Sequence, residues 1–339
     1  MPARAFITGL SGLAVTPEER AFLREARPWG FILFKRNIEN KAQVIRLVGE
    51  VLDELGAEAA VLIDQEGGRV QRLQPPLWPA YPPGAAYGAI YAKDKAKGLA
   101  AARLGARLIA ADLAELGINT DCLPLADVPV SGADQVIGNR AYGDTPEQVA
   151  AVAQAVTDGL AEGGVLPVLK HIPGHGRANA DSHLALPTVS ADRATLERTD
   201  FAAFKPLNRL PMAMTAHVVF NAIDPVSPAT TSATMIAEVI RGFIGFGGLL
   251  MSDDVSMNAL SGTLAERTRA SLKAGCDVAL HCNGKMDEMQ QVAAESPELS
   301  GKAAERASAA LASRKPAVSI DLAQARKDFA TMMAGQVSA

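Results

Sequence analysis

Short apolar runs bounded by glycine, proline or aspartate recur along the chain and alternate with longer stretches that have helical spacing. Short runs of this kind predict buried strands. The predicted strands span residues 5–9, 30–34, 59–63, 120–125, 167–169, 212–215, 247–251 and 277–281. Stretches of good helix formers lie between most of them, at residues 42–55, 96–116, 145–162, 191–204, 232–243 and 264–274.

Strand–helix alternation repeated about eight times predicts an α/β fold, a (β/α)8 barrel of the TIM type. The chain of 339 residues exceeds the roughly 250 that such a barrel needs. We expect residues 1–339 to form a single domain, with the Ala/Glu/Lys-rich residues 286–339 as closing helices and a frayed tail. A doubly wound sheet is the alternative, but it needs a glycine-rich phosphate turn, and Gly9-Leu10-Ser11-Gly12 matches GxGxxG poorly.

Composition narrows the class of protein further. With 48% hydrophobic and only 5% aromatic residues, the core must be built from Ala, Leu, Val and Ile, which favours a layered α/β interior. The formal net charge of -4, without a run of five like charges, excludes a basic groove, so we expect no nucleic-acid partner. Three cysteines without CxxC spacing indicate a reducing compartment. No segment has the apolar length of a signal peptide or a membrane span. We expect a cytoplasmic protein without a membrane partner, and a monomer.

Polar and ionisable residues directly follow most of the predicted strands. Because the carboxyl ends of barrel strands open on one face, where barrel enzymes place their chemistry, we expect these residues to share one mouth. They are Lys35-Arg36-Asn37, Asp64-Gln65-Glu66-Gly67-Gly68-Arg69, Asp127, Lys170-His171, His217, Asp253-Asp254, His281 and Asn283.

Asp253 is the candidate nucleophile. It shares strand parity with Leu249 and Met251, whereas Asp254 has the opposite parity, so only one of the two should reach the barrel axis. The alternative is that this pair merely caps a following helix, since aspartate is favoured there. We expect Asp254 or Ser256 to do the capping and Asp253 to do the chemistry.

Asp181 and His183 form the candidate acid/base pair, within a segment (residues 171–183) that holds three of the five histidines. A carboxylate near an imidazole can fix its tautomer and stabilise its cation, which suits a general acid. Taken alone, a turn in which Asp181 bonds its own backbone and His183 is solvated is the better explanation of these residues. The histidines also suggest a metal, but His171 and His175 are separated by Pro173-Gly174, which prevents both from lying on one helix face. We expect no metal site and no cofactor.

Asp64, Arg72 and Lys170 are charged residues beside apolar strands. Such residues are usually on the surface, but the run Ala-Val-Leu-Ile before Asp64 directs it into the mouth. A carboxylate there can accept hydrogen bonds from sugar hydroxyls, and Lys and Arg can donate to hydroxyls or to a substrate carboxylate.

Several of these segments together resemble glycoside hydrolase family 3, and more closely its single-domain bacterial β-N-acetylglucosaminidases of peptidoglycan recycling. The Lys-His-x-Pro-Gly-His-Gly…Asp-Ser-His combination is highly specific, whereas Ser252-Asp253-Asp254 alone is a weak signal. Ile172 stands where phenylalanine is common. The motifs are residues 63–72, Val136-Ile137-Gly138-Asn139-Arg140-Ala141-Tyr142-Gly143, residues 169–176, Asp181-Ser182-His183 and residues 251–257.

The resemblance implies a retaining mechanism in which Asp253 forms a glycosyl-enzyme and His183, paired with Asp181, protonates the leaving oxygen and then activates water. It implies that N-acetylglucosamine is released from muropeptide fragments containing 1,6-anhydro-N-acetylmuramic acid. It also implies a histidine in place of the second carboxyl of the usual retaining plan. The sugar would be held by Asp64, Arg72, Arg140, Lys170 and His171.

Other functions stay open. Attack by the substrate's own acetamido oxygen usually needs an Asp-Glu pair, which Asp253-Asp254 only partly imitates. A metal-dependent amidohydrolase on the same barrel and a non-catalytic sugar-binding protein are the remaining alternatives. Because Gly174, Gly176 and Asn179 allow unusual backbone conformations, we expect the loop of residues 174–182 to close over the substrate.

Overall fold

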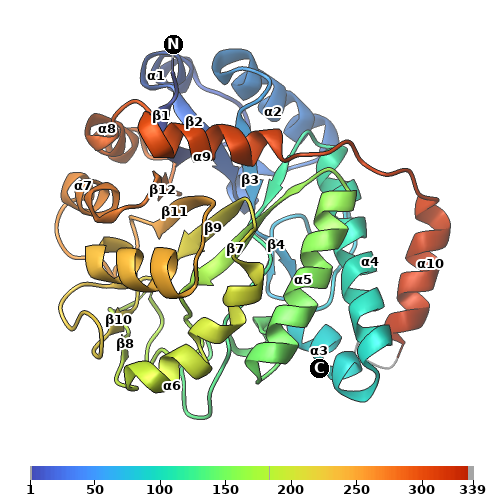
Figure 1. Ribbon diagram of the computed structural model, residues 1–339. Helices are drawn as coiled ribbons and strands as arrows, with labels where there is room; N and C mark the ends of the chain where they lie inside the picture. The colour runs from blue at the N-terminus through green and yellow to red at the C-terminus, as the bar shows by residue number, and fades with distance from the viewer. Residues whose placement is uncertain (1, 183, 335–339) are drawn as a thin grey trace.

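The computed structural model describes residues 2–182 and 184–334, and parallel strands close into a barrel surrounded by helices (Figure 1). Going round the barrel, the strands follow the order β1-β2-β3-β6-β7-β9-β11-β12, and β12 pairs with β1 to close it. The predicted (β/α)8 barrel is therefore confirmed. These strands are β1 (Arg4–Gly9), β2 (Pro28–Leu33), β3 (Ala60–Ile63), β6 (Thr120–Asp121), β7 (Leu166–Ile172), β9 (Met212–Thr215), β11 (Leu249–Asp254) and β12 (Val278–His281).

Helices follow the strands and shield the barrel from solvent. Many begin at a side chain that caps the free backbone N–H groups of the first turn, such as Thr16 with Glu19 and Thr263 with Glu266. After β9 the chain forms a π-helical segment, Met235–Phe243. The other surrounding helices are α1 (Pro17–Ala26), α2 (Lys41–Leu55), α3 (Gly84–Lys93), α4 (Lys95–Ala114), α5 (Pro146–Glu162), α6 (Arg193–Arg198), α7 (Leu264–Ala274) and α8 (Met286–Glu295).

The apolar core has two parts. One lies between strands and helices, and the other fills the barrel interior with residues such as Ile7, Leu62, Met212 and Met251. Alanines of α9 (Gly301–Ala312) join the interior core, and α9 lies across one end of the barrel (Figure 1). No helix in the described ranges is long and apolar enough to cross a membrane.

Beyond α9 the chain crosses the molecule in an extended segment to α10 (Leu322–Met333), which packs on α4 (Figure 1). The guanidinium of Arg326 in α10 lies 2.6 Å from the carboxylate of Asp112 in α4. The closing helices expected after residue 286 are thus present, whereas the predicted tail at residues 335–339 lies outside the described residues. That residues 1–339 form one domain remains a prediction.

The bounds of two elements differ between the prediction and the structure. The fourth strand ends at Asp121 rather than residue 125, because Pro124 has no N–H for the ladder; Leu125 forms only an isolated bridge to Lys170. The helix expected at 191–204 breaks into α6 and short 3-10 turns. The break coincides with Asp200, whose carboxylate accepts hydrogen bonds from Arg177 outside the helix.

Candidate active site

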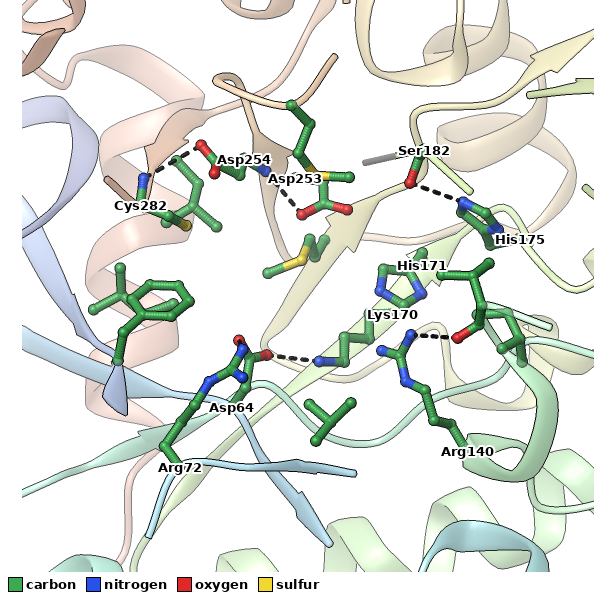
Figure 2. Close-up of a pocket in the computed structure, with 18 of the residues that line it drawn as sticks. Asp64, Arg72, Arg140, Lys170, His171, His175, Ser182, Asp253, Asp254 and Cys282 are labelled. Carbon is green, nitrogen blue, oxygen red and sulfur yellow. Dashed lines mark hydrogen bonds and ion pairs between the residues drawn. The ribbon is translucent and has the colours of Figure 1, made fainter. Parts of the chain in front are cut away.

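A pocket of about 400 Å³ opens at the carboxyl ends of the barrel strands. This is a volume suited to a small ligand. Side chains from the ends of β2, β3, β7, β9, β11 and β12 line it. Of the residues expected at the mouth, those that line the pocket are Arg36, Asp64, Lys170, His171, Asp253, Asp254 and Asn283, whereas Lys35, Asn37, Asp127, His217 and His281 do not line it. Every predicted sugar-binding residue lies there, together with Asp253: Asp64, Arg72, Arg140, Lys170 and His171 (Figure 2).

Asp64 lies at one end of the pocket between two cations. Its carboxylate is 2.8 Å from Nζ of Lys170 and 2.9 Å from the guanidinium of Arg72. Burial alone would raise the pKa of Asp64, but these two cations outweigh burial and hold it below its ordinary value. Asp64 is therefore an ionised acceptor that can bind sugar hydroxyls but cannot donate a proton to a leaving group.

Glu66, from the short strand β4 (Gln65–Gly67), extends this charge network. Its carboxylate forms a bidentate pair with Arg140, at 2.9 and 2.8 Å, and lies 2.6 Å from Lys170. Burial would raise the pKa of Glu66, but Lys170 and Arg140 together lower it. Arg72, Asp64, Lys170, Glu66 and Arg140 thus form a chain of alternating charges.

His171 is oriented by Asp127, which is fully buried after the fourth barrel strand. Nδ1 of His171 donates to the carboxylate of Asp127 at 2.7 Å, and the same carboxylate accepts the backbone N–H of His175 at 2.6 Å. Burial would raise the pKa of Asp127, but the charge of His171 and its hydrogen bond outweigh burial and lower it. The hydrogen bond holds Nδ1 of His171 against Asp127 and leaves Nε2 for a ligand.

Asp253 stands on the opposite side of the pocket from Asp64 (Figure 2). Strand β11 continues through Asp253, and Leu249 and Met251 of the same parity lie in the barrel interior as expected. Asp254 also lines the pocket, as expected for a residue at the mouth, but its carboxylate is engaged by Ser256 and Cys282. The register between β11 and β12 shifts between Met251 and Asp254, which breaks the simple alternation.

Asp254 has a structural role, but it does not cap a helix. Its carboxylate accepts the backbone N–H of Ser256 at 3.0 Å, the hydroxyl of Ser256 at 2.7 Å and the backbone N–H of Cys282 at 3.2 Å. The next helix, α7, begins only at Leu264 and is capped by Thr263. Asp254 therefore holds a turn and joins the ends of two strands.

Hydrogen bonds to Thr215 and His217 hold the backbone at Asp253 and Asp254. The backbone N–H of Asp253 donates to Thr215, whose hydroxyl lies 2.7 Å from that of Thr230. Nε2 of His217 donates to the carbonyl of Asp254 at 2.9 Å, and its Nδ1 lies 2.7 Å from Thr230. Burial lowers the pKa of His217, and the hydroxyl of Thr230 also donates to the carbonyl of Ala216 at 3.1 Å. His217 thus supports the backbone of Asp254, next to Asp253.

The loop after β7 carries Asp181, while the predicted acid/base His183 lies outside the described residues. Gly174 has φ of 138°, which favours glycine, and at Gly176 an added Cβ would lie 2.2 Å from the carbonyl oxygen of Val128. Asn179 does not have the expected unusual backbone; its side chain instead accepts the N–H of Thr188 at 2.8 Å. Closure of this loop over substrate remains a prediction.

Glu66 and Asp127 were expected at the mouth but were given no role there, and His175 and Ser182 were not among the predicted site residues. Glu66 shares strand parity with Asp64, which is a signal that could have identified it. Asp127 follows the fourth strand, so its position at the mouth was expected but its role toward His171 was not. Nothing in the spacing alone indicates that His175 contacts Ser182.

Comparison with known proteins agrees with this geometry. The Glycosyl hydrolase family 3 N terminal domain matches residues 9–311. A β-hexosaminidase from Alkalilimnicola ehrlichii is 39% identical over 279 residues, covering 81% of this chain and 79% of that protein. A β-hexosaminidase from Neisseria meningitidis serogroup C is 36% identical over 299 residues, covering 86% of this chain and 82% of the relative.

The fold is likewise similar to solved structures. Native NagZ from Neisseria gonorrhoeae superposes with a TM-score of 0.87 at 32% identity, covering 100% of this chain and 99% of that one. The same TM-score and identity hold for NagZ from that organism in complex with N-trifluoroacetyl-D-glucosamine. The chain therefore belongs to glycosyl hydrolase family 3 and is a glycoside hydrolase.

Proposed function

We propose that this protein is a retaining exo-β-N-acetylglucosaminidase that removes terminal N-acetylglucosamine from muropeptide fragments by way of a covalent glycosyl-enzyme. The observation that carries the proposal is the placement of Asp253 across the pocket from the hydroxyl-binding set of Asp64, Arg72 and Lys170. The choice of N-acetylglucosamine as the sugar is supported by the relatives named β-hexosaminidase and by the neighbour that binds N-trifluoroacetyl-D-glucosamine.

In the first step, a carboxylate oxygen of Asp253 attacks the anomeric carbon. The bond from that carbon to the leaving oxygen breaks, and His183 gives its proton to that oxygen. In the second step, His183 takes a proton from water while the water oxygen attacks the same carbon and releases Asp253 as carboxylate. The configuration is retained because the two attacks come from opposite faces.

The other groups in the pocket support a histidine as the acid. Asp64 is held ionised by its two cations, and Asp254 is occupied by donors from Ser256 and Cys282. The engagement of Asp254 also argues against acetamide assistance, because that mechanism needs a carboxylate available to the acetamido group. His171 with Asp127 has the composition of an acid/base pair, so it is the competitor that an experiment must separate from His183.

Lys170 and Asp64 close one end of the pocket, with only 2% and 14% of their side chains exposed. A closed end admits a terminal sugar and not the middle of a chain, which supports exo action. We further propose that the leaving group is 1,6-anhydro-N-acetylmuramic acid, that the protein acts in the cytoplasm as a monomer, and that no cofactor takes part.

Hydrolysis of a chromogenic β-N-acetylglucosaminide by wild type, Asp253→Asn, His183→Ala and His171→Ala tests the proposal. We expect near-total loss in Asp253→Asn and unchanged activity with EDTA. The loss of activity in His183→Ala should be smallest for the substrate with the most acidic leaving group. The loss of activity in His171→Ala should not depend on the acidity of the leaving group. The reverse pattern would assign the acid role to His171, and loss with EDTA would favour the amidohydrolase alternative.

A further inference from the structure

Ser182 lies at the centre of a set of contacts that the reaction scheme does not use. It is only 3% exposed, although it belongs to a loop with exposed residues on either side. Its hydroxyl lies 3.1 Å from Nε2 of His175, and its carbonyl accepts the backbone N–H of Ala259 at 3.1 Å. Ser182 thus joins the loop after β7 to the segment that follows β11, the strand that carries Asp253.

His175 is itself held rigidly. Its backbone N–H donates to Asp127 at 2.6 Å, and its ring packs edge-on against His171 with 5.9 Å between the centroids. The chain on either side is anchored as well, since the N–H of Gly174 donates to the carbonyl of His171 and Gly176 lies against the backbone of Val128. His175 therefore presents Nε2 to Ser182 from a fixed position beside the sugar-binding His171 (Figure 2).

The ring of His175 is also constant in charge near neutral pH. Burial, followed by the charge of His171, lowers the pKa of His175 to about 4. A neutral imidazole keeps one donor and one acceptor nitrogen, so either His175 or Ser182 can donate in their shared hydrogen bond.

We propose that His175 and Ser182 are positioning residues, whose hydrogen bond holds the chain next to His183 in place so that His183 delivers its proton efficiently. The inference rests on the proposed function, in which His183 is the acid/base. Neither residue need touch the reacting atoms; each acts through the residue that follows Ser182 in the chain.

The test measures kcat/KM for a dinitrophenyl and a phenyl β-N-acetylglucosaminide. The phenyl leaving group needs a proton as it departs, whereas the dinitrophenyl group does not. A defect in the general acid therefore lowers kcat/KM for the phenyl glycoside but not for the dinitrophenyl glycoside. For Ser182→Ala we expect roughly a 10-fold loss with the phenyl glycoside, the size of one lost hydrogen bond, and a loss below about 2-fold with the dinitrophenyl glycoside. We expect the same pattern of kcat/KM losses for His175→Leu. The loss with the phenyl glycoside should be smaller for His175→Gln, which keeps a polar group near the position of Nε2.

Thr188→Val is the matched control, because it removes a loop hydroxyl that contacts Asn179 and not Ser182. It should leave both substrates unchanged. A second control adds Ser182→Ala to His183→Ala. If Ser182 acts through His183, the double variant is no slower than His183→Ala alone.

Equal losses with both glycosides, a further loss in the double variant, or no loss in Ser182→Ala would overturn the positioning role. A His183→Ala enzyme without leaving-group dependence would instead overturn the acid/base assignment, and this inference with it. If Ser182→Ala does not fold, His175→Gln and His175→Leu give the same comparison.

Discussion

The ammonium nitrogen of Lys170 lies 2.8 Å from Oδ1 of Asp64, and the side chain of Lys170 is almost wholly buried. The same nitrogen lies 2.6 Å from Glu66. Lys170 therefore both neutralises two buried carboxylates and offers a fixed donor to the pocket. Burial would lower the pKa of Lys170, but these carboxylates outweigh burial and raise it, so the charge is permanent.

Removing this cation should destabilise the protein. Lys170→Met leaves Asp64 and Glu66 charged without their shared partner, and loss of one member of a buried ion pair costs about 3 kcal/mol of unfolding free energy. Denaturant unfolding measures the change. Lys41→Met is the control, because Lys41 pairs with Glu115 on the surface and its loss should cost below about 1 kcal/mol. Equal effects of the two substitutions would contradict the network.

Glu66→Gln should weaken sugar binding more than it slows chemistry. The amide keeps the shape of Glu66 but loses the charge that holds Arg140 and Lys170. We expect KM to rise roughly 10-fold, equivalent to about 1.4 kcal/mol, with a smaller change in kcat. Steady-state kinetics separate the two parameters. Glu162→Gln, which touches only an exposed pair with Arg103, should change neither.

Asp127→Asn should disturb His171 without removing it. The carboxylate of Asp127 accepts hydrogen bonds on both oxygens, from Nδ1 of His171 and from the backbone N–H of His175. An amide has only one oxygen, so we expect the orientation of the His171 ring to be lost. We expect kcat/KM to fall roughly 10- to 100-fold, as when a supporting partner of a functional histidine is removed. The fall should be equal for dinitrophenyl and phenyl glycosides. A loss confined to the phenyl glycoside would identify His171 as the acid.

Stability should decline as pH falls from about 6.5 toward 4, before most carboxylates titrate. Burial lowers the pKa of His175 to about 4 from 6.5, so the unfolded chain binds a proton that the folded chain excludes. Protonation in this window therefore favours unfolding, by about 1–3 kcal/mol at full effect. His217, whose pKa is also lowered, acts in the same direction. Thermal melts at a series of pH values should show a shallower decline in His175→Gln than in wild type; identical slopes would contradict the assignment.

The sequence predicted the barrel because each strand is a short apolar run and the helices between have regular spacing. It also predicted the charged residues that follow the strands, since strand ends meet at one mouth. It could not predict the chain of charges through Glu66, because β4 is a short excursion outside the barrel. The pairing of His175 with Ser182 depends on how the loop after β7 folds back, which no local pattern encodes. The shift in register between β11 and β12 could not be predicted from the simple alternation of residues along a strand.

In the proposed mechanism, Asp253 bonds covalently to the sugar. Mass spectrometry of peptides after reaction with a ring-fluorinated β-N-acetylglucosaminyl fluoride tests this bond directly, because the fluorine slows breakdown of the intermediate. We expect one fluorosugar on the peptide that contains Asp253, abolished in Asp253→Asn and retained in Asp254→Asn. Turnover of this reagent with no labelled peptide, or a label on any other residue, would contradict it.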